Sequence, residues 1–215
     1  MTMNKTIKHI IVFFGAVSLI MLGALALSGS QDGIKQVNSP LQENNKLTNN
    51  NMPLYSEASA SLVPLNSEEL SNNSYTILIG TVKEINPSKW NSVDGKRPNG
   101  IDSFSMEHLI YTDIIISVDK YLKNPLSSKE VTVRVDGGTV GNDTYEAMYE
   151  PSFNSNEKVL LYLTKDATNR TKNISPEHYR VTGCMQGKFT LTHNGEAVRP
   201  GENFSQNELL SKIKE

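Results

Sequence analysis

Apolar and polar residues alternate with a period of two over much of the chain beyond residue 74, and this pattern predicts short β-strands. The most regular segment spans Leu109–Leu122, where Ile114 and Ile116 fall on one face and Asp113 and Ser117 on the other. Similar alternation predicts further strands over residues 74–86, 131–136, 159–163, 179–181, 188–192 and 197–198. Because helices do not alternate with these strands, we do not expect a parallel α/β sheet.

Two capping signals predict one helix before the strands and one after them. Asn66 and Glu69 fit a capping box, which predicts a short helix from residue 67. Ser205 and Glu208 fit a second box, and it opens a C-terminal helix whose apolar residues lie within 209–213.

These elements together predict a mainly β fold of six to eight short strands. Asn194-Gly195 adds the strongest two-residue hairpin signal, since both positions of such a turn need a positive φ. A small antiparallel barrel or sandwich is the natural closure, because it leaves few strand edges exposed.

The N-terminus predicts export. An uncharged apolar run of 18 residues, 10–27, follows a basic start that contains Lys5 and Lys8. This is the pattern of a secretory signal peptide, and its length approaches the roughly 20 residues of a transmembrane helix. Residues 1–28 are therefore either a signal peptide or a single-span membrane anchor. The positive-inside tendency places Lys5 and Lys8 in the cytoplasm and the chain after residue 28 outside the cell.

The next segment, 29–59, is rich in Asn, Gln and Ser and shows no period of two or 3.6. A segment of this kind buries too little apolar surface to offset its ordering entropy, so we expect a disordered linker. The folded β-barrel domain then covers residues 60–215.

Composition excludes several classes of protein. The 215 residues carry a formal net charge of −2, whereas nucleic-acid-binding proteins usually present a basic face. Hydrophobic residues make up 37% of the chain, which is too few for a multi-pass membrane protein. The single cysteine, Cys184, rules out an intramolecular disulfide framework and a cysteine-rich zinc site.

An ordered series of five segments carries a resemblance to a known family; the segments are Thr76–Ile85, Ile110–Lys123, Val131–Gly141, Pro151–Leu163 and Tyr179–Phe189. The series resembles a family of exported, uncharacterised prokaryotic single-domain proteins. Their barrel is similar to the OB-fold of netrin-like domains and of tissue inhibitors of metalloproteinases. The resemblance implies an OB-like barrel and an extracellular location. It does not imply inhibition, because those inhibitors use an N-terminal cysteine held by disulfides and this chain has only Cys184.

A polar insertion over residues 90–105 is the main candidate for ligand binding. It holds Trp90, Lys96, Arg97 and Phe104, and Trp and Arg are common anchors in recognition surfaces. Loops between the early strands of OB-folds often border the binding face. The alternative is that Trp90 covers one end of the barrel.

Two weaker candidates involve metal binding and catalysis. Asp136, Asn142 and Asp143 flank a glycine-rich segment and offer oxygen ligands for calcium, although a tight connection between strands explains the same glycines. Cys184 with His178 could form a nucleophile and base, but a lone cysteine is more often a small buried apolar group.

Asp113 interrupts an otherwise apolar strand, and we expect it to pair with Arg134 or Lys188 across the sheet. A catalytic role would need a partner acid, for which Glu84 and Asp119 are the candidates, and a structural role is favoured.

The expected function is that of a non-catalytic, exported binding or envelope-associated module that is tethered to the membrane by its N-terminal helix. Its expected partners are the membrane and an envelope or other extracellular protein, without nucleic acid or a cofactor. One alternative is a secreted inhibitor-like protein that binds a peptidase. Another is a hydrolase that uses Cys184 and His178.

Overall fold

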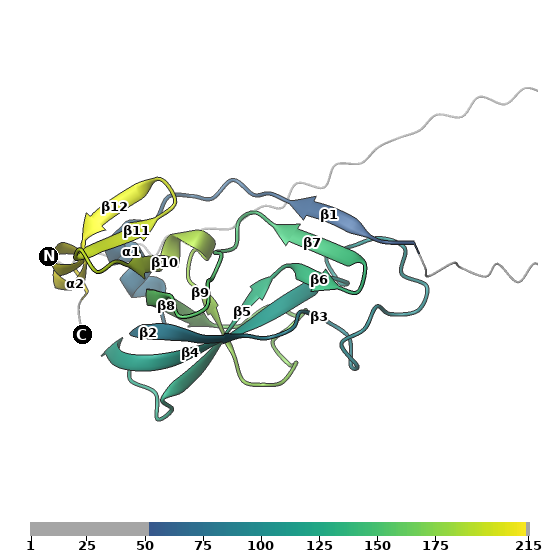
Figure 1. Ribbon diagram of the computed structural model, residues 1–215, viewed down its shortest axis with the longest axis horizontal. Coiled ribbons are helices and arrows are strands. Elements are labelled where there is room, and N and C mark those ends of the chain that lie inside the picture. Colours follow the sequence, from purple (N-terminus) through teal and green to yellow (C-terminus); the bar gives the residue numbers. More distant parts are fainter. Residues whose placement is uncertain (1–51, 214–215) are drawn as a thin grey trace, which may run out of the picture. The chain divides into compact units, whose positions relative to one another are not determined.

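The computed structural model describes residues 52–213, whose arrangement is shown in Figure 1. The predicted signal peptide or anchor, 1–28, and the first part of the predicted linker lie outside the described residues. Within 52–213, no helix is both long enough and apolar enough to cross a membrane.

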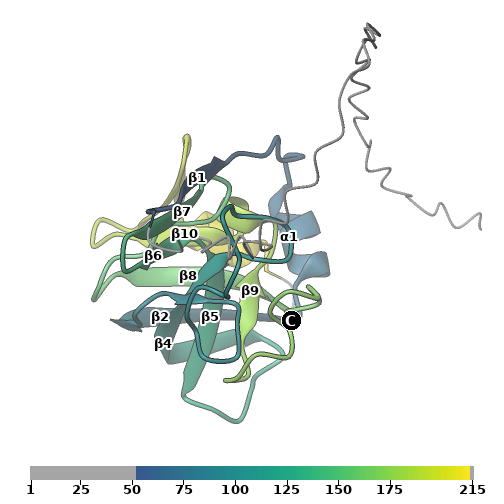
Figure 2. The same ribbon diagram turned by 90° about the vertical axis from the view of Figure 1, so that its right-hand side faces the viewer.

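Five strands form a closed barrel, which confirms the prediction of a mainly β fold. Its members are β2 (Thr76–Ile85), β4 (Ile110–Lys123), β5 (Glu130–Asp136), β8 (Lys158–Lys165) and β9 (Tyr179–Val181). The ring runs β2–β4–β5–β9–β8 and returns to β2, and only the β5–β9 pairing is parallel. Figure 2 shows the same strands after a turn of 90° about the vertical axis.

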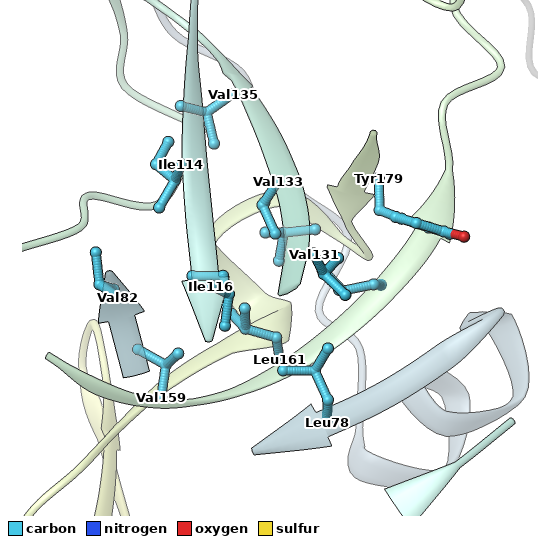
Figure 3. Packing of buried hydrophobic residues seen from close by; sticks show 12 residues of the cluster. Leu78, Val82, Ile114, Ile116, Val131, Val133, Val135, Val159, Leu161 and Tyr179 are labelled. Atoms are coloured by element: carbon cyan, nitrogen blue, oxygen red, sulfur yellow. The ribbon is translucent and has the colours of Figure 1, made fainter. Parts of the chain in front are cut away.

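The barrel interior is filled by the residues that the period of two placed on one face. Ile114 and Ile116 of β4 are 2% and 0% exposed, and they pack against Val133 and Leu161 (Figure 3). Thr132, which points away from this cluster, is only partly buried. The strand faces were therefore assigned correctly from the sequence.

A second apolar cluster covers the outside of the barrel at β2 and β8. Three strands extend the sheet beyond β8, namely β10 (Lys188–Leu191), β11 (Glu196–Arg199) and β12 (Glu202–Ser205). Residues from these strands and from the two helices pack on Leu160 and Tyr162 of β8. Because both faces of β8 are covered, its sequence is apolar almost without interruption.

The two predicted helices are present, but only one begins with the predicted capping box. In α1 (Ser67–Asn73) the Asn66 side chain accepts from the Glu69 N–H at 2.9 Å, and the Glu69 carboxylate accepts from the Asn66 N–H. In α2 (Gln206–Ser211) the Ser205 side chain makes no capping bond. The Glu208 carboxylate instead pairs with Lys212 at 2.6 Å.

The predicted hairpin joins β10 to β11, although its turn differs from the expected type. Gly195 has a positive φ of 81°, whereas Asn194 is not among the described residues with positive φ. The Gly195 N–H donates to the Thr192 carbonyl at 3.2 Å. This bond defines a longer loop in which only the glycine adopts the left-handed conformation.

Five short strands were not predicted. They are β1 (Tyr55–Ala58), β3 (Lys89–Trp90), β6 (Gly138–Val140), β7 (Asp143–Ala147) and β12 (Glu202–Ser205). β1 pairs in parallel with β7, and it lies within the predicted linker 29–59, so the ordered chain begins before residue 60. Its alternate residues stay exposed, and β1 is held mainly by backbone pairing that needs no apolar pattern in its own sequence.

Candidate functional site

Two aromatic rings of the insertion between β2 and β4 form a stack of three with a ring of β7. The Trp90 and Phe104 rings lie parallel with centroids 4.8 Å apart, and Phe104 also stacks on Tyr145 of β7 at 5.2 Å. Trp90 is fully buried, and Phe104 is half-buried. Two of the predicted ligand-binding residues are thus brought together, but the indole lies inside the fold and not on an open face.

The other two residues of that prediction lie on the same loop. Arg97 donates to the Ile101 and Met52 carbonyls at 2.7 and 2.9 Å, and it reaches the Asp143 carboxylate at 3.3 Å. Lys96 is exposed. Arg97 therefore ties the insertion to β7 and to the chain that leads into β1.

The glycine-rich connection holds β6 tightly against the barrel. A Cβ added to Gly138, whose φ is 133°, would lie 2.1 Å from the Ser88 hydroxyl oxygen. Only glycine fits at this point. This agrees with the alternative to a calcium site, in which the glycines serve a tight connection between strands.

The proposed calcium ligands face different cations. Asp136 at the end of β5 pairs with Arg180 at 3.0 Å, whereas Asp143 at the start of β7 pairs with Arg97. Asn142 is exposed in the turn between β6 and β7. Among residues 52–213, no three His, Cys, Asp or Glu side chains are placed to hold a metal ion together.

A buried network of charges lies beside this connection, and the sequence did not predict it. The Asp136 carboxylate accepts from Arg180 at 3.0 Å, from Arg170 at 3.2 Å and from the Tyr149 hydroxyl at 3.1 Å. Arg180 also donates to Glu150. These residues lie up to 44 positions apart, so no local spacing could have indicated the network.

Asp136 and Glu150 both pair with Arg180, and burial has a large effect on the pKa of Glu150. Burial raises the pKa of the Glu150 carboxyl to about 7, since it outweighs the attraction of Arg180, and the Asp136 carboxylate adds to the effect. Burial and the Asp136 charge also raise the pKa of Tyr149. The pKa of Arg180 is raised as well, because both carboxylates outweigh the effect of its burial. Glu150 is thus the group of the network that exchanges a proton near neutral pH.

Cys184 and His178 do not form a nucleophile and base. Both ring nitrogens of His178 have other partners, the Pro176 carbonyl at 2.8 Å and the Asp166 carboxylate at 2.9 Å. Burial raises the pKa of the Cys184 thiol to about 11, and the Glu150 charge contributes. A thiol of this pKa is a poor nucleophile.

Asp166 anchors the loop that contains His178. Burial opposes ionisation of its carboxyl, but hydrogen bonds from Thr171, His178 and Thr168 outweigh burial and lower the pKa to about 2. The carboxylate is therefore a structural acceptor that stays ionised.

Asp113 pairs with Arg134, one of the two partners expected from the sequence. The residues lie opposite each other in β4 and β5 and form a bidentate ion pair at 2.7 and 2.8 Å. Arg134 is fully buried and also donates to the Ile174 carbonyl at 3.0 Å. Lys188, the other expected partner, pairs with Glu157 at 2.6 Å.

A cleft of about 420 Å³ opens between the end of the barrel and the β6–β7 hairpin. We call it the mouth cleft. Ile114 and Phe153 contribute apolar wall, Thr144 and Tyr145 contribute polar wall, and Glu150 lies at one side. Its size lies within the usual range for small-molecule sites, which is about 300–1,000 Å³.

Comparison with known proteins gives no family for the chain. No protein-family model matches it, and no curated protein gives a significant match.

Proposed function

We propose that the chain is an exported, non-catalytic binding module, tethered to the membrane by residues 1–28, whose barrel binds its ligand in the mouth cleft. The expected ligand is an envelope component or another extracellular protein. The proposal includes an OB-like barrel, which is supported by the closed ring of five strands and by the long insertion between its first two members.

One observation carries the binding role, namely that the mouth cleft is open while the acids buried in its wall are already paired. Asp136 is bonded to two arginines and a tyrosine, and Glu150 is bonded to Arg180. The pKa of Glu150, about 7, would suit acid–base catalysis, but its side chain is only 6% exposed and is held against Arg180, so we assign it to the structure of the wall. A cleft whose wall acids are already paired favours the binding of a ligand by shape and hydrogen bonds over catalysis.

Blocking the mouth cleft tests the proposal. Thr139 lies exposed on β6 at the rim of the cleft, and a Thr139→Trp change would fill the opening. Asn203→Trp is the matched control, because Asn203 is also exposed, lies on β12 and does not line the cleft. The full chain, immobilised, is incubated with labelled envelope extract of its own cells. Retention lost in the Thr139 variant alone supports the proposal, and equal retention by all three proteins contradicts it.

Fractionation of cells tests the tether. A retained anchor keeps the protein in the membrane fraction through carbonate extraction. Recovery of a soluble form that begins near residue 27 or 29 would instead identify a cleaved signal peptide. That result would favour the secreted, inhibitor-like alternative.

A further inference from the structure

The chain contains two Asn-Gly pairs, Asn99-Gly100 and Asn194-Gly195. Asparagine is among the thermally labile residues. Its side-chain amide is open to attack by the backbone nitrogen of the next residue, and glycine leaves that nitrogen accessible because it has no Cβ. All four residues are exposed, so the bonds made by each glycine N–H decide which pair reacts.

The structure holds the two glycine peptides differently. The Gly195 N–H donates to the Thr192 carbonyl at 3.2 Å, and the Gly195 carbonyl accepts from the Gln206 N–H at 2.8 Å. Within residues 52–213, neither the Gly100 N–H nor the Asn99 side-chain amide forms a hydrogen bond. In this part of the chain the attacking nitrogen is thus free at Gly100 and already bonded at Gly195.

Asn99 and Gly100 are the two central residues of a turn in the insertion between β3 and β4. The Ile101 N–H donates to the Pro98 carbonyl at 3.3 Å, and Gly100 has a φ of 80°, as the third residue of a type II turn requires. A Cβ placed on Gly100 would meet no atom within 4 Å beyond the adjoining residues. Nothing therefore packs over the reacting peptide, and water reaches it.

We propose that Asn99 is a site of spontaneous deamidation in the folded protein. The Gly100 nitrogen forms a bond to the Asn99 Cγ, the Cγ–Nδ2 bond breaks, and ammonia leaves with the proton of the Gly100 N–H. Water then opens the resulting cyclic imide. Opening at the Cγ carbonyl gives aspartate, and opening at the main-chain carbonyl gives isoaspartate, in which the chain continues through the former side chain. The site does not involve the mouth cleft, so it is independent of the function proposed above.

The isoaspartate product acts on the bonds that Arg97 makes. The Ile101 carbonyl accepts from Nε and Nη2 of Arg97, the first at 2.7 Å. The same guanidinium donates to the Met52 carbonyl and to the Asp143 carboxylate. Isoaspartate adds one carbon to the backbone between Pro98 and Ile101, so the hydrogen bond that closes the turn no longer fits. Deamidation therefore opens the turn and loosens the attachment of the insertion.

Peptide mass spectrometry of the full chain, kept in detergent at mildly alkaline pH, tests the site. One sample stays folded and the other is unfolded in guanidinium chloride, and the replacement of NH₂ by OH is followed at both Asn-Gly pairs. In the folded protein Asn99 should convert about two- to tenfold faster than Asn194, which is the effect of one hydrogen bond on a rate. In guanidinium chloride the two should convert at similar rates, because neither glycine N–H is then held.

Variants test the attacking nitrogen and the effect on the turn. Gly100→Ala places a Cβ beside that nitrogen and should slow conversion of Asn99 about tenfold. Gly195→Ala is the matched control, because Gly195 has a φ of 81° and equally open surroundings, and it should leave Asn99 unaffected. The Ile101 amide should exchange hydrogen faster in the purified isoaspartate protein than in Asn99→Asp, which carries the same charge on a backbone of normal length.

Several results would overturn the proposal. One is conversion of Asn194 in the folded protein that is as fast as that of Asn99. Another is an Asn99 that stays intact in the folded protein while it converts in guanidinium chloride. If the same ratio of the two rates appeared in both samples, the local sequence and not the fold would set it. Equal exchange of the Ile101 amide in the isoaspartate protein and in Asn99→Asp would refute the opening of the turn.

Discussion

The Glu150 carboxyl should make the stability of the protein depend on pH in a direction opposite to that of Asp166, whose pKa is lowered. Glu150→Gln is the informative change, since glutamine has nearly the same shape and its oxygen can still accept from Arg180. It removes the negative charge and the proton exchange. Because the Glu150 side chain is only 6% exposed, solvent screens this effect little.

The magnitude follows from the difference between the two states. The pKa of Glu150 is about 7 in the folded protein, against 4.5 for the group in an unfolded chain. The folded state therefore binds this proton more tightly, and the associated stability is complete below pH 4.5 and is lost as the pH rises through 7. Between about pH 5 and 8 the parent should lose about 2–3 kcal/mol of unfolding free energy that the variant keeps.

Urea unfolding of the parent and the Glu150→Gln protein across this range measures the difference. Glu146→Gln is the matched control, because it removes the same charge from an exposed position on β7. We expect the control to follow the parent at every pH. If the parent instead gained stability over the variant as the pH rose, attraction to Arg180 would outweigh burial, and the assignment of Glu150 as the neutral member of the network would be wrong.

Three further predictions concern the core, the loop acceptor and the thiol. Ile116→Ala should lower the free energy of urea unfolding by about 2–5 kcal/mol, and Thr132→Ala far less, because only Ile116 fills the barrel; equal losses would contradict the assigned faces. Asp166→Asn should destabilise the protein at neutral pH but not near pH 2, since the lowered pKa adds stability that is lost as the pH falls; an equal loss at both pH values would contradict this. Cys184 should react with iodoacetamide at about pH 8 at least a hundredfold more slowly than free cysteine, as followed by mass spectrometry, and rapid alkylation would contradict the raised pKa of its thiol.

The sequence alone determined the features that depend on neighbours in the chain. The alternation through β4 placed Ile114 and Ile116 on the inner face of the barrel, because successive side chains of a strand point to opposite sides. The capping box at Asn66 formed for the same reason, since its partner lies three residues away. The pairing of Asp113 with Arg134 could be predicted because an isolated acid on an apolar strand needs a cation across the sheet.

Some local signals were overridden by the fold. Ser205 is the last residue of β12 and is paired with Glu196, so its backbone conformation is set by the strand before α2 begins. The Glu208 side chain pairs with Lys212 and does not complete the predicted capping box. Tertiary pairing thus decided the start of this helix.

Only the tertiary structure decided where the candidate sites lie. β1 and β7 pair through their backbone groups. Such pairing requires no apolar pattern in the sequence, so the two strands could not be predicted from one. Asp136, Glu150 and Arg180 come from three separate parts of the chain, and their charges become consequential only once they are buried together. Among residues 52–213 the Trp90 indole N–H likewise has no hydrogen-bond partner only because it is buried, since water satisfies the same group in an unfolded chain.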